Sequence, residues 1–167
     1  MADTEELVRL RAFLLGSGPG SGSGHYVART SEEAAAWRHN YRAWLAKLLP
    51  GSDAVHVAVI DGTDGLAACA IAVVDQRAPT HLCPDGQVGW VQTVVVDPAM
   101  RRRGLGLRVM GYVMDWFQER GIRTVFLQTT SAAADLYTRI GFQPTGEDTM
   151  IAVLSPPLND DREALTS

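Results

Sequence analysis

The sequence predicts an α/β domain, and three patterns along its 167 residues support that prediction. Short runs of β-branched residues, which favour strands, alternate with stretches whose apolar residues recur every three to four positions, as on one face of a helix. Turns that contain glycine or proline separate these stretches. The chain is 46% hydrophobic and 20% charged, which is ordinary for a globular domain with a substantial core. We therefore expect one domain over residues 1–154 and a loose tail over residues 155–167.

Two helices are predicted in the first third of the chain. Residues 4–15 carry leucines along one helical face. A second helix should begin with Ser31 as its cap, carry acidic residues in its first turn and end at Pro50. Between them, residues 16–24 contain five glycines and three serines, a composition that predicts a mobile loop.

The rest of the chain predicts five strands. Residues 55–60 and 66–74 flank the turn sequence DGTDG, so they should form an antiparallel hairpin. Residues 88–96 and 125–128 are further runs rich in β-branched or aromatic residues, and residues 149–154 predict a final strand.

An arginine-rich turn predicts a phosphate-binding site. A strand stops at Asp97-Pro98, the sequence RRRGLG follows, and a helix with a clear apolar period begins near Gly104. Unpaired N–H groups and the positive end of the dipole lie at that helix start, and neither Gly104 nor Gly106 has a side chain that would keep an anion away. The guanidinium groups of the three arginines suit phosphate oxygens.

Two other phosphate-binding motifs do not fit this turn. A Walker loop requires Gly-Lys-Ser/Thr, but Leu107 and Arg108 follow Gly106, and a dinucleotide fingerprint requires glycine where Val109 stands. The remaining alternative is a solvated run of charge. Because cations at a helix N-terminus oppose the dipole, we favour a bound anion.

Two signatures resemble those of the GNAT superfamily of acyl-CoA N-acyltransferases. The stretch from Arg101 to Gly106 is similar to its R/Q-x-x-G-x-G/A motif, and residues 133–142, AADLYTRIGF, are similar to its second motif, a short helix with Leu-Tyr that ends at Gly-Phe. Two ordered signatures are more specific than one. The resemblance covers roughly residues 54–154 and implies the GNAT fold, an α/β fold with a mixed, mostly antiparallel central sheet flanked by helices.

One strand of that fold is not found in the sequence. Relatives begin with a strand before the first helix, and residues 1–4 are too short and too acidic to supply it. The first edge strand is therefore expected to be absent, or replaced by residues 26–30.

The resemblance implies transfer of an acetyl group from acetyl-CoA, the co-substrate, to a primary amine of a small-molecule acceptor, by direct attack in a ternary complex. Two alternatives stay open: acetylation of a protein N-terminus or lysine, and a non-catalytic acyl-CoA sensor. In this fold a bulge in the strand over residues 91–96 presents backbone groups to the pantetheine arm. The implied acyl-CoA-binding residues are Val94, Val95, Val96, Arg101, Arg102, Arg103, Gly104, Leu105, Gly106, Leu107, Thr130 and Ser131.

Tyr137 matches the tyrosine whose hydroxyl often faces the leaving sulfur in this superfamily, and the alternative is an aromatic that only packs. Transfer of its proton, at a pKa of about 10, to a thiolate of about 8.5 is uphill by roughly 2 kcal/mol, so a hydrogen bond to the sulfur is expected to matter more than full transfer. Thr130 stands where many relatives have asparagine, and a hydroxyl is expected to take over that contact.

The acceptor cleft of relatives corresponds here to Tyr26, Trp37, Tyr41, His81, Asp85 and Trp90. Trp90 stands where some relatives have a glutamate that acts as general base, and tryptophan cannot take a proton. His81, Asp85, Gln92 through a water, and the pair Glu32 and Glu33 are the remaining candidates, and the sequence does not choose among them.

Composition excludes several other classes. Fifteen basic and nineteen acidic residues give a net charge of −4, which argues against a nucleic-acid partner. The sequence shows neither a membrane-spanning stretch nor a signal peptide, so a cytoplasmic protein without a membrane partner is expected. Cys69 and Cys83 are too few for a disulfide scaffold, and Cys83 with His81 makes a poor metal site, so no metal is expected. A homodimer is compatible with the resemblance.

Overall fold

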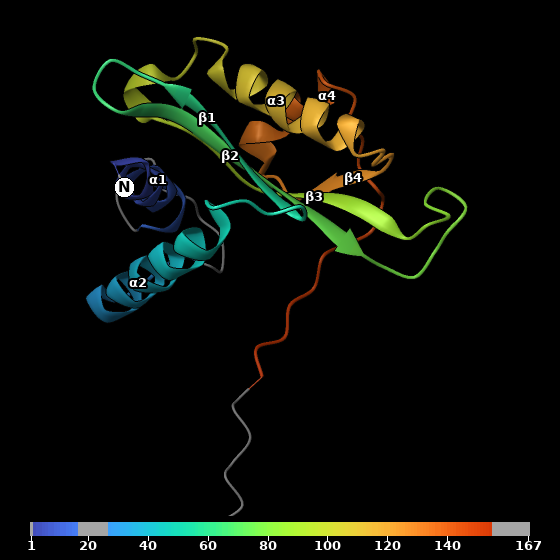
Figure 1. The fold of residues 1–167 in the computed structure, drawn as a ribbon, viewed down its shortest axis with the longest axis horizontal. Helices are drawn as coiled ribbons and strands as arrows, with labels where there is room; N and C mark the ends of the chain where they lie inside the picture. Colours follow the sequence, from blue (N-terminus) through green and yellow to red (C-terminus); the bar gives the residue numbers. More distant parts are fainter. Residues whose placement is uncertain (1, 17–26, 155–167) are drawn as a thin grey trace, which may run out of the picture.

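The computed structural model describes residues 2–16 and 27–154, and it forms a four-stranded sheet with helices on both faces (Figure 1). The elements in chain order are α1 (Ala2–Leu15), α2 (Ser31–Leu48), β1 (Val55–Asp61), β2 (Leu66–Gln76), β3 (Gln87–Val96), the 3-10 turn η1 (Pro98–Met100), α3 (Leu105–Glu119), β4 (Val125–Leu127), the 3-10 turn η2 (Ser131–Ala133) and α4 (Ala134–Thr138). The predicted mobile loop lies almost wholly outside the described residues, as do Tyr26 and the tail after residue 154.

The sheet has the order β1-β2-β3-β4. Strands β1, β2 and β3 pair antiparallel, whereas β4 pairs parallel with β3. Helix α3 connects β3 to β4, and it is long enough for the crossover that a parallel pair needs. The predicted α/β class and the mixed, mostly antiparallel sheet are therefore confirmed.

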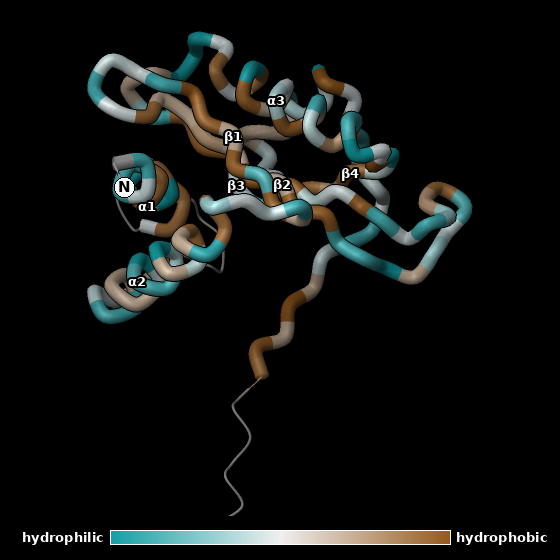
Figure 2. The backbone as a smooth tube through the Cα atoms, in the orientation of Figure 1, coloured by the Kyte–Doolittle hydropathy of each residue, from teal (hydrophilic) through white to brown (hydrophobic). Residues whose placement is uncertain are grey.

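Strand β2 is buried on both faces because helices cover both sides of the sheet. Its residues from Leu66 to Ala72 are all buried, and most of them are alanine, which lets the helices approach closely. On one face α3 contributes the fully buried Val113 and Phe117, and on the other α1 and α2 contribute Leu10 and Leu45. Figure 2 shows these hydrophobic positions along the strands and on the neighbouring sides of the helices.

The cap of α2 is Thr30, one residue before the predicted Ser31. The hydroxyl of Thr30 accepts the N–H of Glu33 at 3.1 Å, and the Glu33 carboxylate accepts the N–H of Thr30 at 3.2 Å. This reciprocal capping box requires glutamate three residues after the cap. Thr30 has Glu33 at that position, whereas Ser31 would have Ala34.

No strand precedes β1 in the part of the chain that the structure describes, and residues 27–30 do not replace the missing edge strand. The N–H of Ala28 donates to the carbonyl of Leu15 at 2.9 Å, and Thr30 is committed to the cap of α2. These bonds hold the segment at the end of α1, so β1 stays at the edge of the described sheet.

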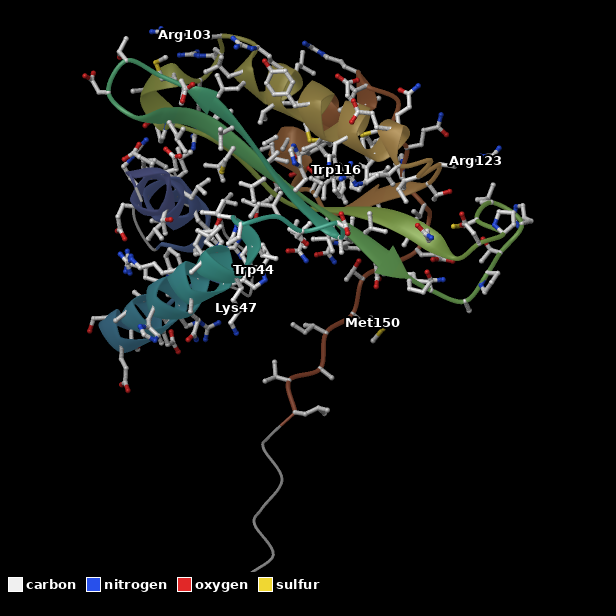
Figure 3. All side chains as sticks on the ribbon, in the orientation of Figure 1. Trp44, Lys47, Arg103, Trp116, Arg123 and Met150 are labelled. Atoms are coloured by element: carbon white, nitrogen blue, oxygen red, sulfur yellow. The ribbon has the colours of Figure 1, made fainter. Side chains whose placement is uncertain are left out.

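The strand predicted for residues 149–154 is wrong. This segment runs without a strand partner, and its large side chains are exposed: Met150 93%, Val153 88% and Leu154 85%. It leaves the body of the molecule below the sheet, where Met150 is labelled (Figure 3). High β propensity alone does not form a strand, because a strand needs a neighbour for its backbone hydrogen bonds. Among the described helices, none has the length and apolar character needed to cross a membrane.

Candidate functional site

Strand β3 contains one residue more than the stretch of β2 that faces it. Thr93 pairs with Ile71 and Val91 pairs with Ala72, so Val91 and Gln92 together face a single residue of β2. This is a β-bulge, which bends the strand and shifts the direction of the backbone groups beyond it. The bulge expected for this strand is therefore present, and the exposed Gln92 is the extra residue.

Beyond the bulge, one edge of β3 has no strand partner among the described residues. Parallel pairing with β4 ends at Val91, opposite Leu127. The N–H of Asp97 donates to the carbonyl of Ala67 in β2 at 2.9 Å. Because backbone groups alternate in direction along a strand, Thr93 and Val95 also face β2, whereas Val94 and Val96 face the open edge.

A side-chain contact supports that direction. Nε of Arg101 donates to the carbonyl of Val96 at 3.4 Å, so this carbonyl is bonded to a side chain of the following turn. The polar backbone groups of Val94 and Val96 thus lie at an edge that β4, which ends at Leu127, does not cover. A ligand with amide groups could pair with them as an additional strand would.

The first turn of α3 begins next to this edge. Gly104, the N-cap, has φ +75, a conformation that glycine adopts without strain, and no atom lies within 4 Å of the position that a Cβ would occupy. The first bond of the helix runs from the N–H of Arg108 to the carbonyl of Gly104 at 3.1 Å. The N–H groups of residues 105–107 therefore precede the hydrogen-bonded turns of the helix and can bind an anion.

Gly106, which is also predicted to bind the co-substrate, leaves room for a side chain of α4. It is buried, and a Cβ there would lie 2.7 Å from Cδ1 of Leu136 and 3.8 Å from Cγ2 of Val96. The missing side chain makes room for α4 to pack against α3 and β3, rather than for an anion. Its backbone N–H still belongs to the first turn of the helix.

The three arginines before Gly104 are exposed, and none forms an ion pair with a carboxylate that the structure describes. Arg102 has φ +60, which a residue with a side chain seldom adopts. Arg103 lies at the rim of the molecule, at the end of the sheet where α3 begins (Figure 3). The turn therefore holds concentrated positive charge beside a helix N-terminus.

Tyr137 on α4 is half-buried and meets Phe142 edge to face, with ring centroids 6.1 Å apart. It packs against the same apolar cluster as Val94, Val96 and Leu105. Burial raises the pKa of its phenol, so the hydroxyl stays protonated at neutral pH. Thr130 and Ser131 are exposed at the turn between β4 and α4.

Tyr137 also lines a groove of about 1120 Å³. The walls of this groove come from β4, α4 and residues 143–151. None of the residues of the open edge of β3 or of the first turn of α3 lines this groove; the position of Leu136 next to Gly106 places α4, which carries Tyr137, beside the start of α3.

The residues predicted for the acceptor are not gathered in one place. Trp37 and Tyr41 lie next to each other on α2 and pack in the core between α2 and the sheet, where burial raises the pKa of Tyr41 to about 12. His81 and Asp85 lie in the exposed loop before β3. Asp85 accepts the N–H of Gln87 at 3.0 Å, and this bond lowers its pKa and ties it to its own turn.

Trp90 lies in the middle of the short stretch over which β3 pairs with β4, opposite Phe126. Its ring stacks on Phe126 at 6.1 Å, and the guanidinium of Arg77 lies 5.2 Å from the Trp90 ring and 5.6 Å from the Phe126 ring. Successive side chains of a strand point to opposite faces of the sheet. The rings of Trp90 and Phe126 therefore lie on the face away from α3. No local sequence pattern points to Phe126 or Arg77, because only strand pairing, of β3 with β4 and of β2 with β3, brings them beside Trp90.

Comparison with known proteins identifies the family. The model of the Acetyltransferase (GNAT) family matches residues 23–142, which is more than half of the chain. The chain therefore belongs to the GNAT family of acetyltransferases.

Three relatives illustrate the range of this similarity. Glucosamine 6-phosphate N-acetyltransferase 1 of Oryza sativa subsp. japonica is 36% identical over 92 residues, which are 55% of this chain and 54% of that protein. The ribosomal protein bS18-alanine N-acetyltransferase of Salmonella typhimurium is 29% identical over 125 residues, 70% of this chain and 78% of that protein. The crystal structure of a GCN5-related N-acetyltransferase from Ralstonia eutropha JMP134 has a TM-score of 0.64 and 28% identity, covering 75% of this chain and 82% of that one. The chain spans about half the length of the Oryza protein.

Among the described residues, no three histidine, cysteine, aspartate or glutamate side chains gather as metal ligands would. Both cysteines are buried, and burial raises the pKa of the Cys69 thiol to about 12.

The open edge of β3 makes a direct prediction for amide hydrogen exchange. In the free protein, the N–H groups of Thr93 and Val95 should exchange slowly because they face β2, whereas those of Val94 and Val96 should exchange much faster. Residue-resolved exchange by NMR measures this alternation. Equal protection of all four amides would contradict the open edge.

Proposed function

We propose that this protein transfers an acetyl group from acetyl-CoA to a primary amine of a small-molecule acceptor. The observation that carries the proposal is the open polar edge of β3 at Val94 and Val96, which lies beside the start of α3, where α4, the helix of Tyr137, also packs. Such an edge fits the amide-containing pantetheine arm, and the helix start fits a pyrophosphate. Membership of the GNAT family supports the same co-substrate.

Each part of the region would then have one task. The N–H groups of residues 105–107 and the arginines of the preceding turn would bind the phosphates of acetyl-CoA. The backbone groups of Val94 and Val96 would hold the arm that ends in the thioester, and a backbone N–H near the bulge would polarise its carbonyl. Gly104 would keep this approach open, because it places no side chain beside the phosphates.

The reaction is a direct displacement. The neutral amine attacks the thioester carbonyl carbon, a C–N bond forms, the C–S bond breaks and the nitrogen loses a proton. The protonated Tyr137 hydroxyl would hydrogen-bond to the leaving sulfur and stabilise its developing charge. Because a free alkylamine has a pKa near 10, its proton must go to a base or to solvent.

The acceptor would approach from the face of the sheet opposite α3, where Trp90, Phe126 and Arg77 lie beside the paired stretch of β3 and β4. The exposed Gln92 at the bulge would face the same approach. A peptide amine is a second candidate acceptor, because one relative, which this chain covers over 78% of its length, is named for acetylation of a ribosomal protein alanine.

A thiol-release assay with acetyl-CoA and a panel of amines tests the proposal. The panel contains amino sugars, polyamines and amino acids on one side, and peptides with free N-termini or lysines on the other. Turnover of free small amines is expected. Turnover of peptides alone would select the second candidate, whereas tight CoA binding without any turnover would indicate a sensor and overturn the proposed activity.

Substitution of Gly104 by valine should abolish acetyl-CoA binding. A valine at φ +75 is strained, and its side chain would occupy the open space in front of the helix N-terminus. Gly121→Val is the matched control, because Gly121 follows the other end of α3 with φ +71 and also has open space around it. Calorimetric titration of both folded variants measures their affinity for acetyl-CoA. An equal loss of affinity in both variants would mean that backbone strain causes it. Unchanged affinity of Gly104→Val would contradict the phosphate site proposed at this helix start.

Replacing Tyr137 with phenylalanine should reduce turnover by roughly 10- to 1,000-fold while acetyl-CoA affinity changes little, because only the hydroxyl is lost. Tyr112→Phe removes a hydroxyl from an exposed tyrosine on α3 and serves as the control. Steady-state kinetics with the best amine of the panel measure the effect. Wild-type turnover of Tyr137→Phe would leave this residue a packing aromatic.

A further inference from the structure

Two arginines of α1 contact the half of β3 beyond the bulge, which pairs with β2 but not with β4. Nη1 of Arg11 donates to the hydroxyl of the buried Thr93 at 2.7 Å, immediately after the bulge. Nη1 of Arg9 donates to the carboxylate of Asp97 at 2.6 Å, immediately after the last residue of the strand. The two contacts therefore bracket Val94 and Val96, whose backbone groups face the open edge.

Arg9 is held in place by further bonds. Its Nη2 donates to the carbonyl of Leu66 at 2.8 Å and to the carboxylate of Glu6 at 2.9 Å. Glu6 in turn accepts the N–H of Leu66 at 2.9 Å. The hydrogen bond from Arg9 is the main reason why the pKa of Glu6 is low, so the carboxylate stays charged at neutral pH. Arg9 thus joins the beginning of β2 to the end of β3 at a fixed separation.

The other oxygen of Asp97 continues this connection toward the phosphate-binding turn. It accepts the N–H of Ala99 at 2.9 Å and so starts η1, the 3-10 turn that leads to the arginines and Gly104. The orientation of Asp97 therefore determines where the chain leaves β3. Arg9 acts on that orientation through an ion pair rather than through any contact with the turn itself.

The half of β3 beyond the bulge needs such support. It is bonded to β2 on one edge and lacks β4 on the other, whereas the half before the bulge has strands on both edges. Helix α1 packs on the face of the sheet opposite α3, across β2 and β3 (Figure 1). Within the part of the chain that the structure describes, the side chains that donate hydrogen bonds to the Thr93 hydroxyl and the Asp97 carboxylate are its arginines.

We propose that Arg9 and Arg11 are positioning residues for acyl-CoA: through Asp97 and Thr93 they fix the open edge of β3 and the start of the phosphate-binding turn. This inference rests on the proposed function. It assigns to α1, which precedes both signatures and carries neither, a role in the binding of the co-substrate rather than of the acceptor.

The test compares Arg9→Met with Arg42→Met. Methionine keeps much of the apolar stem in both. Arg42 of α2 pairs with Glu5 of α1 at 2.7 Å, so its replacement also removes one arginine charge and one ion pair of α1 but leaves β3 untouched. In Arg9→Met, acetyl-CoA affinity by calorimetry should fall by about 10-fold or more, with the acceptor KM within about 2-fold; Arg42→Met should bind acetyl-CoA as the wild type does.

Two further variants separate positioning from stability. In Asp97→Asn, the additional change Arg9→Met should cost little more affinity, because Arg9 acts through that carboxylate. Thr93→Val removes one hydroxyl and keeps the shape, so it should fold, and it should raise the KM for acetyl-CoA at least about 3-fold with the acceptor KM unchanged. Exchange of the Val95 amide, slow in the wild type, should accelerate in both Arg9→Met and Thr93→Val.

The outcomes are distinct. Affinity of Arg9→Met within 2-fold of a wild type that binds acetyl-CoA would overturn this inference and leave the proposed function intact. Equal losses in Arg9→Met and Arg42→Met, together with unchanged KM values in Thr93→Val, would make the contacts merely stabilising and overturn it as well. Absence of acetyl-CoA binding in the wild type would instead refute the proposed function.

Discussion

Strand β3 is hydrogen-bonded to β2 on both sides of its bulge but to β4 over only three residue pairs, and the candidate site follows from that difference. Had β4 paired with β3 along its whole length, the backbone groups of Val94 and Val96 would be used within the sheet. The bulge at Gln92 marks the change from a closed to an open edge. A strand that is stabilised on one side only can offer its other side to a ligand without unfolding.

The layers around the sheet keep that edge rigid. The small residues of β2 let α3 pack on one face and α1 with α2 on the other, and the two apolar clusters meet across the strand. Since the backbone of β3 cannot be fixed by β4 beyond Val91, side chains fix it instead. The half-buried Val94 and Val96 pack on the α3 face, and the buried Val95 and the arginines of α1 hold the other face.

Local patterns were the part of this structure that the sequence predicted well. The helix period after Gly104 and the DGTDG turn between two apolar runs are properties of neighbouring residues, so α3 and the β1-β2 hairpin could be predicted. Whether residues 149–154 form a strand could not be predicted from their own pattern, because a strand depends on a partner elsewhere in the chain. Trp90, Phe126 and Arg77 come together only through the register of strands that are distant in the chain, which the pattern of neighbouring residues does not show. The cap of α2 could have been predicted correctly, since a capping box requires glutamate three residues after the cap, and Glu33 stands there for Thr30 but not for Ser31.

Gly106 shows how the two signatures of the chain depend on each other. The absent side chain of this residue is filled by Leu136, the neighbour of Tyr137 on α4. The leucine of the second signature thus occupies space that the glycine of the first leaves open, so the size of one residue limits the size of the other. A larger residue at position 106 would meet the end of the flexible Leu136 side chain, so that side chain would have to move or position 136 would have to become smaller. We would therefore look for paired substitutions at these positions when sequences of this type diverge, with the size of one compensating the size of the other.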